Sequence, residues 1–342
     1  MDEGANLKHV GIGTDIVKAV SHPLKGVSGM LRRWSGILSI ALVCLLLAPP
    51  ATPAAAQSPA VSGSSIIPAS GVLLGAWVAN RKGLSHYDSV RRFERRIIRR
   101  RLAIDNHFRT WDNRYWREEA KDLAAGRIPM VTWGDWGRTS ANEINSGSQD
   151  ALIREKANAI ASLGGPVLLR WAPEMAGGNY GSAESYINAW KRIRGLFMQE
   201  GATNAIWVWC PTAWSFENGK APAYYPGDSQ VDWIAADGYN WYPASGPWKR
   251  LRNIFGAFYE WGSSRGKPLM IAATGTMEDP KRRGRKARWF GNIVPFLKDR
   301  PDLKAFVYLH ARSPKGYEFS VDTSRRSKRA FRRMAGRPYM DP

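Results

Sequence analysis

Cysteine is scarce in this sequence, which has only Cys44 and Cys210 among its 342 residues. A disulfide framework and a zinc site held by cysteines are therefore excluded. Acidic residues are also few, because 29 Asp and Glu stand against 50 Lys and Arg and leave a net charge of +21. The chain is nevertheless rich in rings, with 16 Trp, 12 Tyr and 11 Phe. A disordered basic protein has little apolar surface to bury, so this composition predicts a folded, strongly basic domain.

No apolar run in the sequence reaches the roughly 20 residues that a membrane-spanning helix needs. The run at residues 37–48 follows two arginines and precedes a stretch rich in Ala and Pro. This order is typical of a signal peptide, so we predict one at residues 1–56, with cleavage before Gln57 and a true start at Met30. The alternative is an uncleaved N-terminal anchor. The domain is expected outside the cytoplasm in both cases, as a secreted or periplasmic protein or as a membrane-anchored one.

Short apolar runs alternate with segments of helical period beyond the leader, which is the pattern of parallel strands joined by crossover helices. Strands are expected at about 72–78, 102–105, 128–133, 166–171, 205–210, 231–236, 268–273 and 304–310. Eight such units predict an α/β fold, a (β/α)8 TIM barrel, as a single domain at residues 72–342 after a Ser/Pro/Ala-rich linker at 57–71. An open doubly wound sheet is disfavoured, since no Gly-x-Gly-x-x-Gly follows the first strand.

Aromatic and polar residues gather at the expected C-terminal strand ends, where TIM barrels carry their active sites. Sugar rings stack their apolar faces on aromatic side chains and take hydrogen bonds at their hydroxyl edges. This ring of residues therefore favours a polysaccharide ligand, although any one Trp can equally be a core residue. The candidate substrate-binding residues are Trp77, His107, Trp111, Trp133, Arg170, Trp209, Asp237, Tyr239, Trp241 and His310.

Several sequence segments resemble one enzyme family. They include Leu-Leu-Arg-Trp-Ala-Pro-Glu-Met at 168–175, Gly-Ala-Thr-Asn-Ala-Ile-Trp-Val-Trp at 201–209 and Lys-Pro-Leu-Met-Ile-Ala at 267–272. These segments, in this order, are similar to those of glycoside hydrolase family 26. The resemblance implies a (β/α)8 barrel and retaining hydrolysis of a β-linked polysaccharide such as mannan, β-glucan or xylan. It also implies two catalytic glutamates, at the ends of strands four and seven.

The two catalytic positions of the family are occupied differently here. Glu174 matches the acid/base in Arg-x-x-x-Glu-Met, whereas Ala273 occupies the nucleophile position in Ile-Ala-Ala-Thr-Gly. A methyl group cannot form a glycosyl-enzyme, so double displacement is closed unless Glu278 or Asp237 substitutes. The remaining interpretations are a chain inactivated at the nucleophile and a natural carbohydrate-binding pseudoenzyme.

The substrate implied by the resemblance is narrowed by two departures from the family pattern. Pro173 stands where mannan-degrading members usually carry His, and Ala176 follows Glu-Met where the family often has Asn. Mannan is therefore in doubt, and a β-glucan or an exopolysaccharide is at least as well supported. We predict no cofactor and no metal, because the sequence shows no His, Asp and Glu cluster with ligand spacing.

Basic residues are concentrated in runs at 91–101, 281–288 and 325–333. Outer helices of a barrel expose one face to water, so most of this charge is expected to be solvated surface. The functional alternative is attraction to an acidic glycan or an anionic membrane surface. Nucleic-acid binding is disfavoured, since it would require basic residues interleaved with aromatics on one face.

Overall fold

A closed ring of eight parallel strands forms the centre of the computed structural model, which describes residues 66–113, 116–134, 137–313 and 315–340. Each strand pairs with the next, and β1 pairs with β8 to close the ring. The strands are β1 (Leu73–Val78), β2 (Ile104–Arg109), β3 (Ile128–Trp133), β4 (Val167–Trp171), β5 (Ala205–Trp209), β6 (Trp233–Asn240), β7 (Leu269–Thr276) and β8 (Leu303–His310). The predicted (β/α)8 fold is confirmed.

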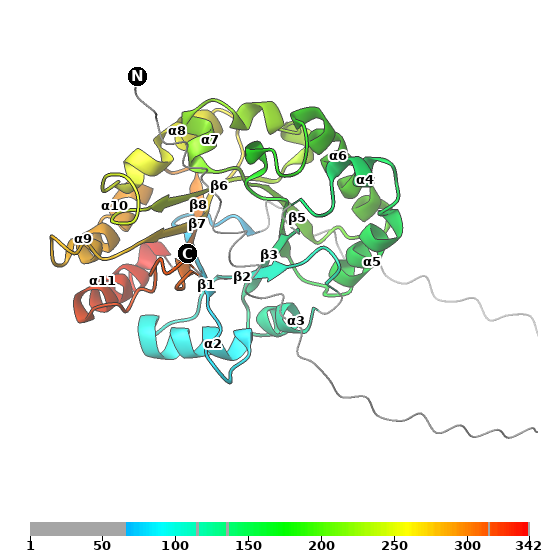
Figure 1. The fold of residues 1–342 in the computed structure, drawn as a ribbon. Coiled ribbons are helices and arrows are strands. Elements are labelled where there is room, and N and C mark those ends of the chain that lie inside the picture. Colours follow the sequence, from blue (N-terminus) through cyan, green and yellow to red (C-terminus); the bar gives the residue numbers. More distant parts are fainter. Residues whose placement is uncertain (1–65, 114–115, 135–136, 314, 341–342) are drawn as a thin grey trace, which may run out of the picture.

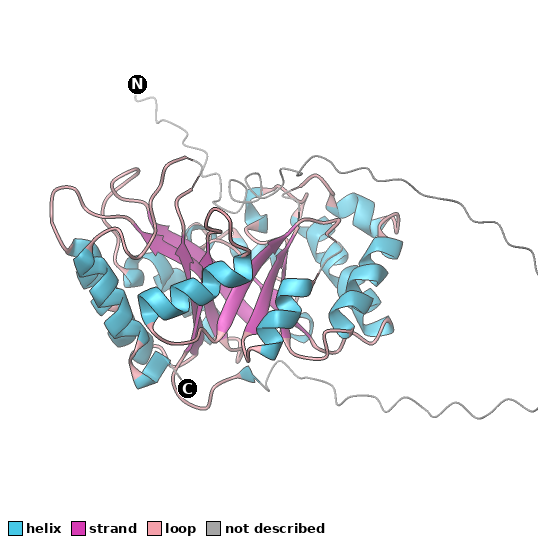
Figure 2. Ribbon diagram, turned by 90° about the horizontal axis from the view of Figure 1, so that it is seen from below, coloured by secondary structure: helices cyan, strands magenta, loops and turns pink. Residues whose placement is uncertain are grey.

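Helices form an outer ring around these strands (Figures 1 and 2). The α-helices are α2 (His86–Phe93), α3 (Arg117–Ala124), α4 (Ala141–Asn145), α5 (Asp150–Ala161), α6 (Ala183–Gln199), α7 (Ala213–Glu217), α8 (Leu251–Ser263), α9 (Arg285–Gly291), α10 (Ile293–Lys298) and α11 (Arg325–Ala335). Shorter turns are the π-helix η2 (Glu94–Ile98) and the 3₁₀ helices η3 (Met175–Gly177), η4 (Ala221–Tyr224), η5 (Asp228–Gln230) and η6 (Pro338–Met340). No helix within these described ranges has the length and apolar composition of a membrane span.

The core has two layers because successive strand residues point to opposite faces. In β4, Leu168 belongs to the cluster that fills the barrel, while Leu169 and Trp171 belong to the larger cluster between the barrel and its helices. Most of the tryptophans lie in this outer layer, where Trp171 stacks on Tyr186 with ring centroids 5.1 Å apart. The aromatic richness of the sequence therefore serves first to fix the helices to the barrel.

The packed chain begins slightly earlier than the sequence predicted. Ile66 and Ile67, within the expected linker at 57–71, pack against the cluster inside the barrel. Ala103, just before β2, and Ile128, at the start of β3, pack against the same cluster. The expected signal peptide at 1–56 and the expected start at Met30 lie outside the described residues.

Three strands extend further than predicted, and this extension shapes the site. β2 continues to Arg109, β6 to Asn240 and β7 to Thr276. The pairing of β6 with β7 also shifts between Ala236 and Asp237, so that Ala236 faces Ile271 but Asp237 faces Ala273. Such a bulge re-aims the side chains that follow it. Residues that the sequence placed in loops are consequently held on rigid strands.

Candidate active site

A cleft of about 450 Å³ opens at the C-terminal ends of the strands. It is bordered by the segments that follow β4 and β5, by the end of β6 and by residues after β8. Acidic and aromatic side chains face each other across it, including Glu174, Trp214, Asp237, Tyr239, Trp241 and Tyr317. A concave site that combines ring faces with a few convergent polar groups suits a carbohydrate.

Arg170 and Asp237 form the buried polar floor of this cleft. Both guanidinium contacts come from Nη1, which lies 2.6 Å and 2.8 Å from the two Asp237 carboxylate oxygens. The Arg170 Nε donates to Thr132 Oγ1 at 2.9 Å, and the Cys210 thiol lies 3.3 Å from Asp237 Oδ1. These partners satisfy the buried charges, since an unpaired buried ion would be strongly destabilising. Asp237 is therefore fixed in place by Arg170 on β4 and by Cys210, the residue just after β5.

Glu174 sits above this floor on a strained backbone. It has a left-handed φ of 61°, and Ala172 two residues earlier has a φ of 44°. Such conformations cost of order 1–3 kcal/mol each and cluster at functional sites. The Glu174 amide donates to the Cys210 carbonyl at 2.8 Å, which anchors the turn to β5. The turn thus holds one carboxyl group over the cleft floor at an energetic cost.

The carboxyl group of Glu174 is in hydrogen-bond contact with that of Asp237. Burial, together with the negative charge of Asp237, raises the pKa of Glu174 to about 8. Burial also raises the pKa of Asp237, but its contacts with Arg170, Cys210 and Glu174 oppose that effect. The proton shared by the pair therefore resides on Glu174. A carboxylic acid that stays protonated at neutral pH is the form that a general acid requires.

Ala273 lies on β7 directly opposite Asp237 in the strand pairing. Its side chain packs with Phe108, Tyr239 and Leu309 at the mouth of the barrel, and it is 7% exposed. A small hollow also borders it, between Trp77 and Phe108. The bulge brings Ala273 to the barrel interior, and Asp237 connects its position to Glu174. Ala273 borders this hollow, whereas its strand partner Asp237 lines the cleft.

Five of the predicted binding residues lie at the barrel mouth. Arg170 and Asp237 form the floor, and Tyr239 and Trp241 line the cleft with ring centroids 5.2 Å apart. Trp77 packs edge-on against Phe108 at 5.4 Å, beside the hollow next to Ala273. All five come from strand positions whose side chains point inward, or from the residue just after such a strand.

Three predicted binding tryptophans belong instead to the core. Trp111 stacks on Trp133 with centroids 4.4 Å apart, and both are at most 6% exposed. Trp209 is fully buried among rings such as Phe216 and Trp261. Because strand residues alternate, Trp133 and Trp209 face the helices rather than the cleft. The expectation that these side chains bind substrate was wrong, because all three pack in the cluster between the barrel and its helices.

The two predicted histidines also point outward. His107 lies 2.6 Å from Asp122 Oδ2 of α3, and the His310 ring accepts the Val321 amide at 3.0 Å and packs on Phe93. Burial lowers the pKa of His310 to about 4, so this ring is neutral. Neither histidine lines the cleft, so the expectation that they bind substrate was wrong. As with the tryptophans, the alternation of side chains along the strand turns these residues toward the helices.

Sequence reasoning missed several cleft residues. Trp214 on α7 is 50% exposed, although large apolar side chains are normally covered, and Glu217 and Lys249 form a 3.7 Å ion pair nearby. Asn179 and Tyr317 also line the cleft. Trp214 and Glu217 follow the fifth strand by a few residues. Because active sites of TIM barrels lie at the C-terminal ends of the strands, this position could have identified both as cleft residues. Asn179 and Tyr317 lie in long loops with no comparable pattern.

The substitute nucleophiles considered from the sequence are placed differently by the fold. Glu278 accepts hydrogen bonds from Ser327 and Thr323 at the start of α11, at 2.6 Å and 2.9 Å, and does not line the cleft. Asp237 does line it, but it is held by Arg170 and already touches Glu174. A retaining pair needs carboxyl groups about 5 to 5.5 Å apart, with space for the sugar between them. Neither carboxylate is arranged for that role.

Glycosyl hydrolase family 26 is the family whose model matches this chain, over residues 137–290. Endoglucanase H of Acetivibrio thermocellus is 28% identical over 80% of this chain and 31% of its own length. Beta-1,3-xylanase of an Alcaligenes species is 28% identical over 56% of this chain and 46% of its own length. The matches thus span less than half of either curated relative.

Solved structures share the barrel. A GH26 beta-mannanase from Bacteroides ovatus superposes with a TM-score of 0.58 at 18% identity, over 79% of this chain and 90% of that one. The catalytic domain of an endo-beta-1,4-mannanase from Bacillus sp. JAMB-750 gives 0.60 at 15% identity, over 79% and 86%. At sequence identities this low, the superpositions show only that the fold is shared. The family model and the curated relatives, in contrast, match the amino-acid sequence itself. Together they confirm the resemblance seen in the sequence: the chain is a homologue of the glycosyl hydrolase family 26 enzymes.

Proposed function

We propose that this protein binds a β-linked polysaccharide in the cleft, with Glu174 placed as the general acid. The observation that carries the proposal is a carboxylic acid held protonated by Asp237 and burial within an aromatic cleft. Such a group donates a proton to the glycosidic oxygen of a bound chain as the bond breaks. Trp214, Tyr239 and Trp241 supply ring faces for the sugars on either side.

This chain lacks the nucleophile that would form a covalent glycosyl-enzyme intermediate. A retaining hydrolase needs a carboxylate that attacks the anomeric carbon, and Ala273 offers only a methyl group. Within the described residues the cleft carboxylates are Glu174, Asp237 and Glu217. Asp237 is paired with Arg170, and Glu217 is an exposed group paired with Lys249. We therefore infer tight binding with very slow hydrolysis; the alternative is a natural polysaccharide-binding pseudoenzyme.

A β-glucan is the preferred ligand among the candidates. The relative matched over most of this chain is named as an endoglucanase, and Pro173 and Ala176 depart from the pattern of mannan-degrading members. Mannan and xylan stay as alternatives, since other relatives are named for them. The expected leader supports action outside the cytoplasm, where such polymers occur.

Tryptophan fluorescence tests the binding proposal. Trp214 is half exposed in the cleft, so addition of β-glucan oligosaccharides should change its emission in a saturable way. Trp214→Phe should remove most of that change. Trp261→Phe, at a ring packed behind β5, is the matched control and should keep it. No saturable change with β-glucan, mannan or xylan oligosaccharides would refute a carbohydrate function for the cleft.

A second surface supports binding of an acidic glycan. The three basic runs of the sequence lie on neighbouring elements, because α11 contacts both α9 and η2, and η2 continues α2 (Figure 1). Their exposed members are Arg91, Arg92, Arg95, Arg96, Arg99, Arg101, Lys281, Arg282, Arg283, Arg288, Arg325, Arg326, Arg329 and Arg333. We call these fourteen side chains the basic face. Concentrated charge of one sign attracts an acidic polymer over a long range.

A further inference from the structure

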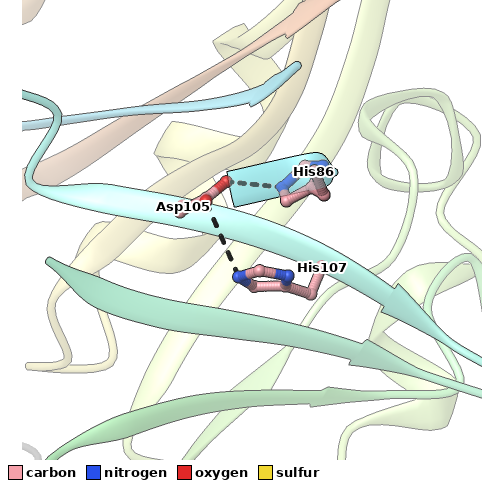
Figure 3. Close-up of side chains that lie close together, drawn as sticks. All are labelled: His86, Asp105 and His107. Carbon is pink, nitrogen blue, oxygen red and sulfur yellow. Dashed lines mark hydrogen bonds and ion pairs between the residues drawn. The ribbon is translucent and has the colours of Figure 1, made fainter. Parts of the chain in front are cut away.

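His86, Asp105 and His107 come together behind the barrel wall (Figure 3). Asp105 and His107 are two residues apart on β2, so both point outward, and His86 at the start of α2 faces them. The potential ligand atoms of the three side chains all lie within 4.8 Å of one another, and all three residues are buried. The sequence spacing did not reveal this cluster, because His86 reaches it only through the packing of α2 on the barrel.

We propose that His86, Asp105 and His107 form a binding site for a divalent transition-metal cation of the Zn²⁺ type, outside the polysaccharide cleft. Imidazole nitrogen and carboxylate oxygen are ordinary zinc ligands, at about 2.0 to 2.2 Å from the metal. Two ligands at that distance in a tetrahedron are about 3.3 to 3.5 Å apart. The observed separations are 2.9 Å between His86 Nε2 and Asp105 Oδ1, and 3.7 Å between His107 Nε2 and Asp105 Oδ2.

An unsatisfied atom in the cluster points to a missing ligand. Asp105 Oδ2 is buried without a hydrogen-bond partner, and His107 Nε2, at 3.7 Å, is beyond hydrogen-bond range. A buried carboxylate oxygen without a partner is costly, and such groups are rare in native proteins. A cation between Asp105 and the two imidazoles would satisfy it. The Oε2 atom of Glu119, on the other side of His107, is also buried and unpartnered.

The charged side chains around His86, Asp105 and His107 carry a net negative charge of two. Four buried carboxylates are among them, from Glu94, Asp105, Glu119 and Asp122. Two guanidinium groups, from Arg109 and Arg127, offset half of them. One divalent cation would balance the remaining two negative charges. Glu118 at the partly exposed rim adds a further carboxylate nearby.

Asp122 lies beside this cluster and is already a partner of His107. Asp122 Oδ2 lies 2.6 Å from His107 Nε2, a hydrogen bond that a metal bound at that nitrogen would replace. His107 would release its proton on binding, since only the neutral imidazole is a ligand. The resulting site would join α2 and β2, with Asn80 holding the second nitrogen of His86 at 3.2 Å as an outer partner. We therefore assign the metal a structural role.

Metal content of the full chain tests this site. Protein stripped with a chelator and dialysed against Zn²⁺ should retain about one equivalent, and saturating Zn²⁺ should raise the melting temperature by about 5 °C. Co²⁺ in place of Zn²⁺ should give the visible absorption of a four-coordinate ion. These three readouts use the unmodified chain and need no variant to fold.

Variants assign the binding to the cluster. His86→Gln and His107→Gln should abolish both the retained equivalent and the thermal shift. His310→Gln is the matched control, because His310 is another histidine between strand and helix that lies outside the cluster, and it should keep both. Absence of stoichiometric metal in the unmodified chain would overturn the proposal. Retention of metal by both cluster variants would overturn it as well, since the ion would then be held elsewhere.

Discussion

Glu174 and Asp237 share one proton and have opposite roles. Arg170 favours the ionised form of Asp237 against the effect of burial on its pKa, and the negative charge of Asp237 raises the pKa of Glu174. Like charges in contact cannot both ionise without a large cost, so each carboxyl fixes the state of the other. In this arrangement Arg170 influences the protonation of Glu174 through Asp237, although Arg170 itself does not line the cleft.

The shared proton predicts a pH-dependent stability difference between the native chain and Glu174→Gln. The folded-state pKa of Glu174, about 8, is above the ordinary value of 4.5, so the protonated acid contributes its full stabilisation below pH 4.5. That contribution is lost as the pH rises through 8. Gln keeps a donor for Asp237 and has no proton to lose. Relative to the native chain, the variant should therefore gain on the order of 1–3 kcal/mol between pH 4.5 and pH 8.

Urea unfolding of both proteins across this pH range measures the difference. Glu143→Gln is the control, because Glu143 is an exposed carboxylate in a capping box and its pKa is lowered rather than raised. A stability difference that does not change with pH would show that Glu174 is not held protonated.

Trp209 and Trp241 should respond oppositely to truncation. Trp209 is fully buried behind β5, so Trp209→Ala should cost about 3–5 kcal/mol of stability. Trp241 is half-buried in the cleft, so Trp241→Ala should weaken β-glucan binding at a smaller cost in stability. Denaturant unfolding and oligosaccharide titration measure the two effects. Strong binding loss in folded Trp209→Ala, with none in Trp241→Ala, would contradict the assignment of inward and outward faces.

The sequence predicted residue types at the site better than it predicted their direction. Arg170, Asp237 and Tyr239 face the cleft, but His107 does not. The second strand was expected to end at 105, two residues before His107, so its alternation could not be applied to that side chain. The strand instead runs to Arg109, and its alternation turns His107 outward. A one-residue difference in position reverses the face.

At the scale of elements, the basic face arises from helices that the sequence treats as separate. The runs at 91–101 and 325–333 are more than 200 residues apart, yet Arg332 of α11 donates to the backbone carbonyls of Arg96 and Ile97 at 2.9 Å and 2.6 Å. The barrel brings its last helix beside its first. The sequence pattern predicted the exposed charges of each helix separately. They form one surface only because β8 pairs with β1, which places the last helix beside the first.

Removing charge from the basic face should weaken binding of an acidic glycan at low salt. Exposed charges are screened beyond about 8 Å at physiological ionic strength, so the effect of Arg95→Gln with Arg96→Gln should shrink as salt rises. Arg100 is excluded from this variant because its Nη1 donates to the Ala335 and Met340 carbonyls. Binding of a uronic-acid polymer at several salt concentrations measures the effect.

The matched control removes equal charge elsewhere. Lys191→Gln with Arg265→Gln changes α6 and the end of α8, outside the basic face, and should alter binding little. Equal weakening by both variants, or weakening by the Arg95 and Arg96 variant that persists at high salt, would argue against a role for this face in charge-based attraction.

At the scale of the whole molecule, the eight-strand barrel was predictable because each βα unit carries its own local pattern. All eight expected strands are present, with ends that differ by at most four residues. The cluster of His86, Asp105 and His107 was not predictable, because it depends on how α2 packs against β2. Tertiary neighbours of this kind leave no periodic mark in the sequence.

Export is a further prediction at this scale. If the leader is cleaved as proposed, protein recovered from outside the cytoplasm should begin at Gln57, because the small residues that a signal peptidase accepts end there. N-terminal sequencing of that fraction measures it. Recovery of a chain that starts at Met1 or Met30 in the membrane fraction would instead support an anchor.

We propose that Glu174 is a competent acid and that Ala273 prevents covalent catalysis. The direct measurement compares hydrolysis of β-glucan, mannan and xylan by the native chain, Ala273→Glu and the uncharged control Ala273→Gln. Ala273→Glu should raise the rate by at least about a thousandfold, with retained anomeric configuration, and Ala273→Gln should not. Full activity in the native chain, abolished by Glu217→Gln or Asp237→Asn, would contradict the account.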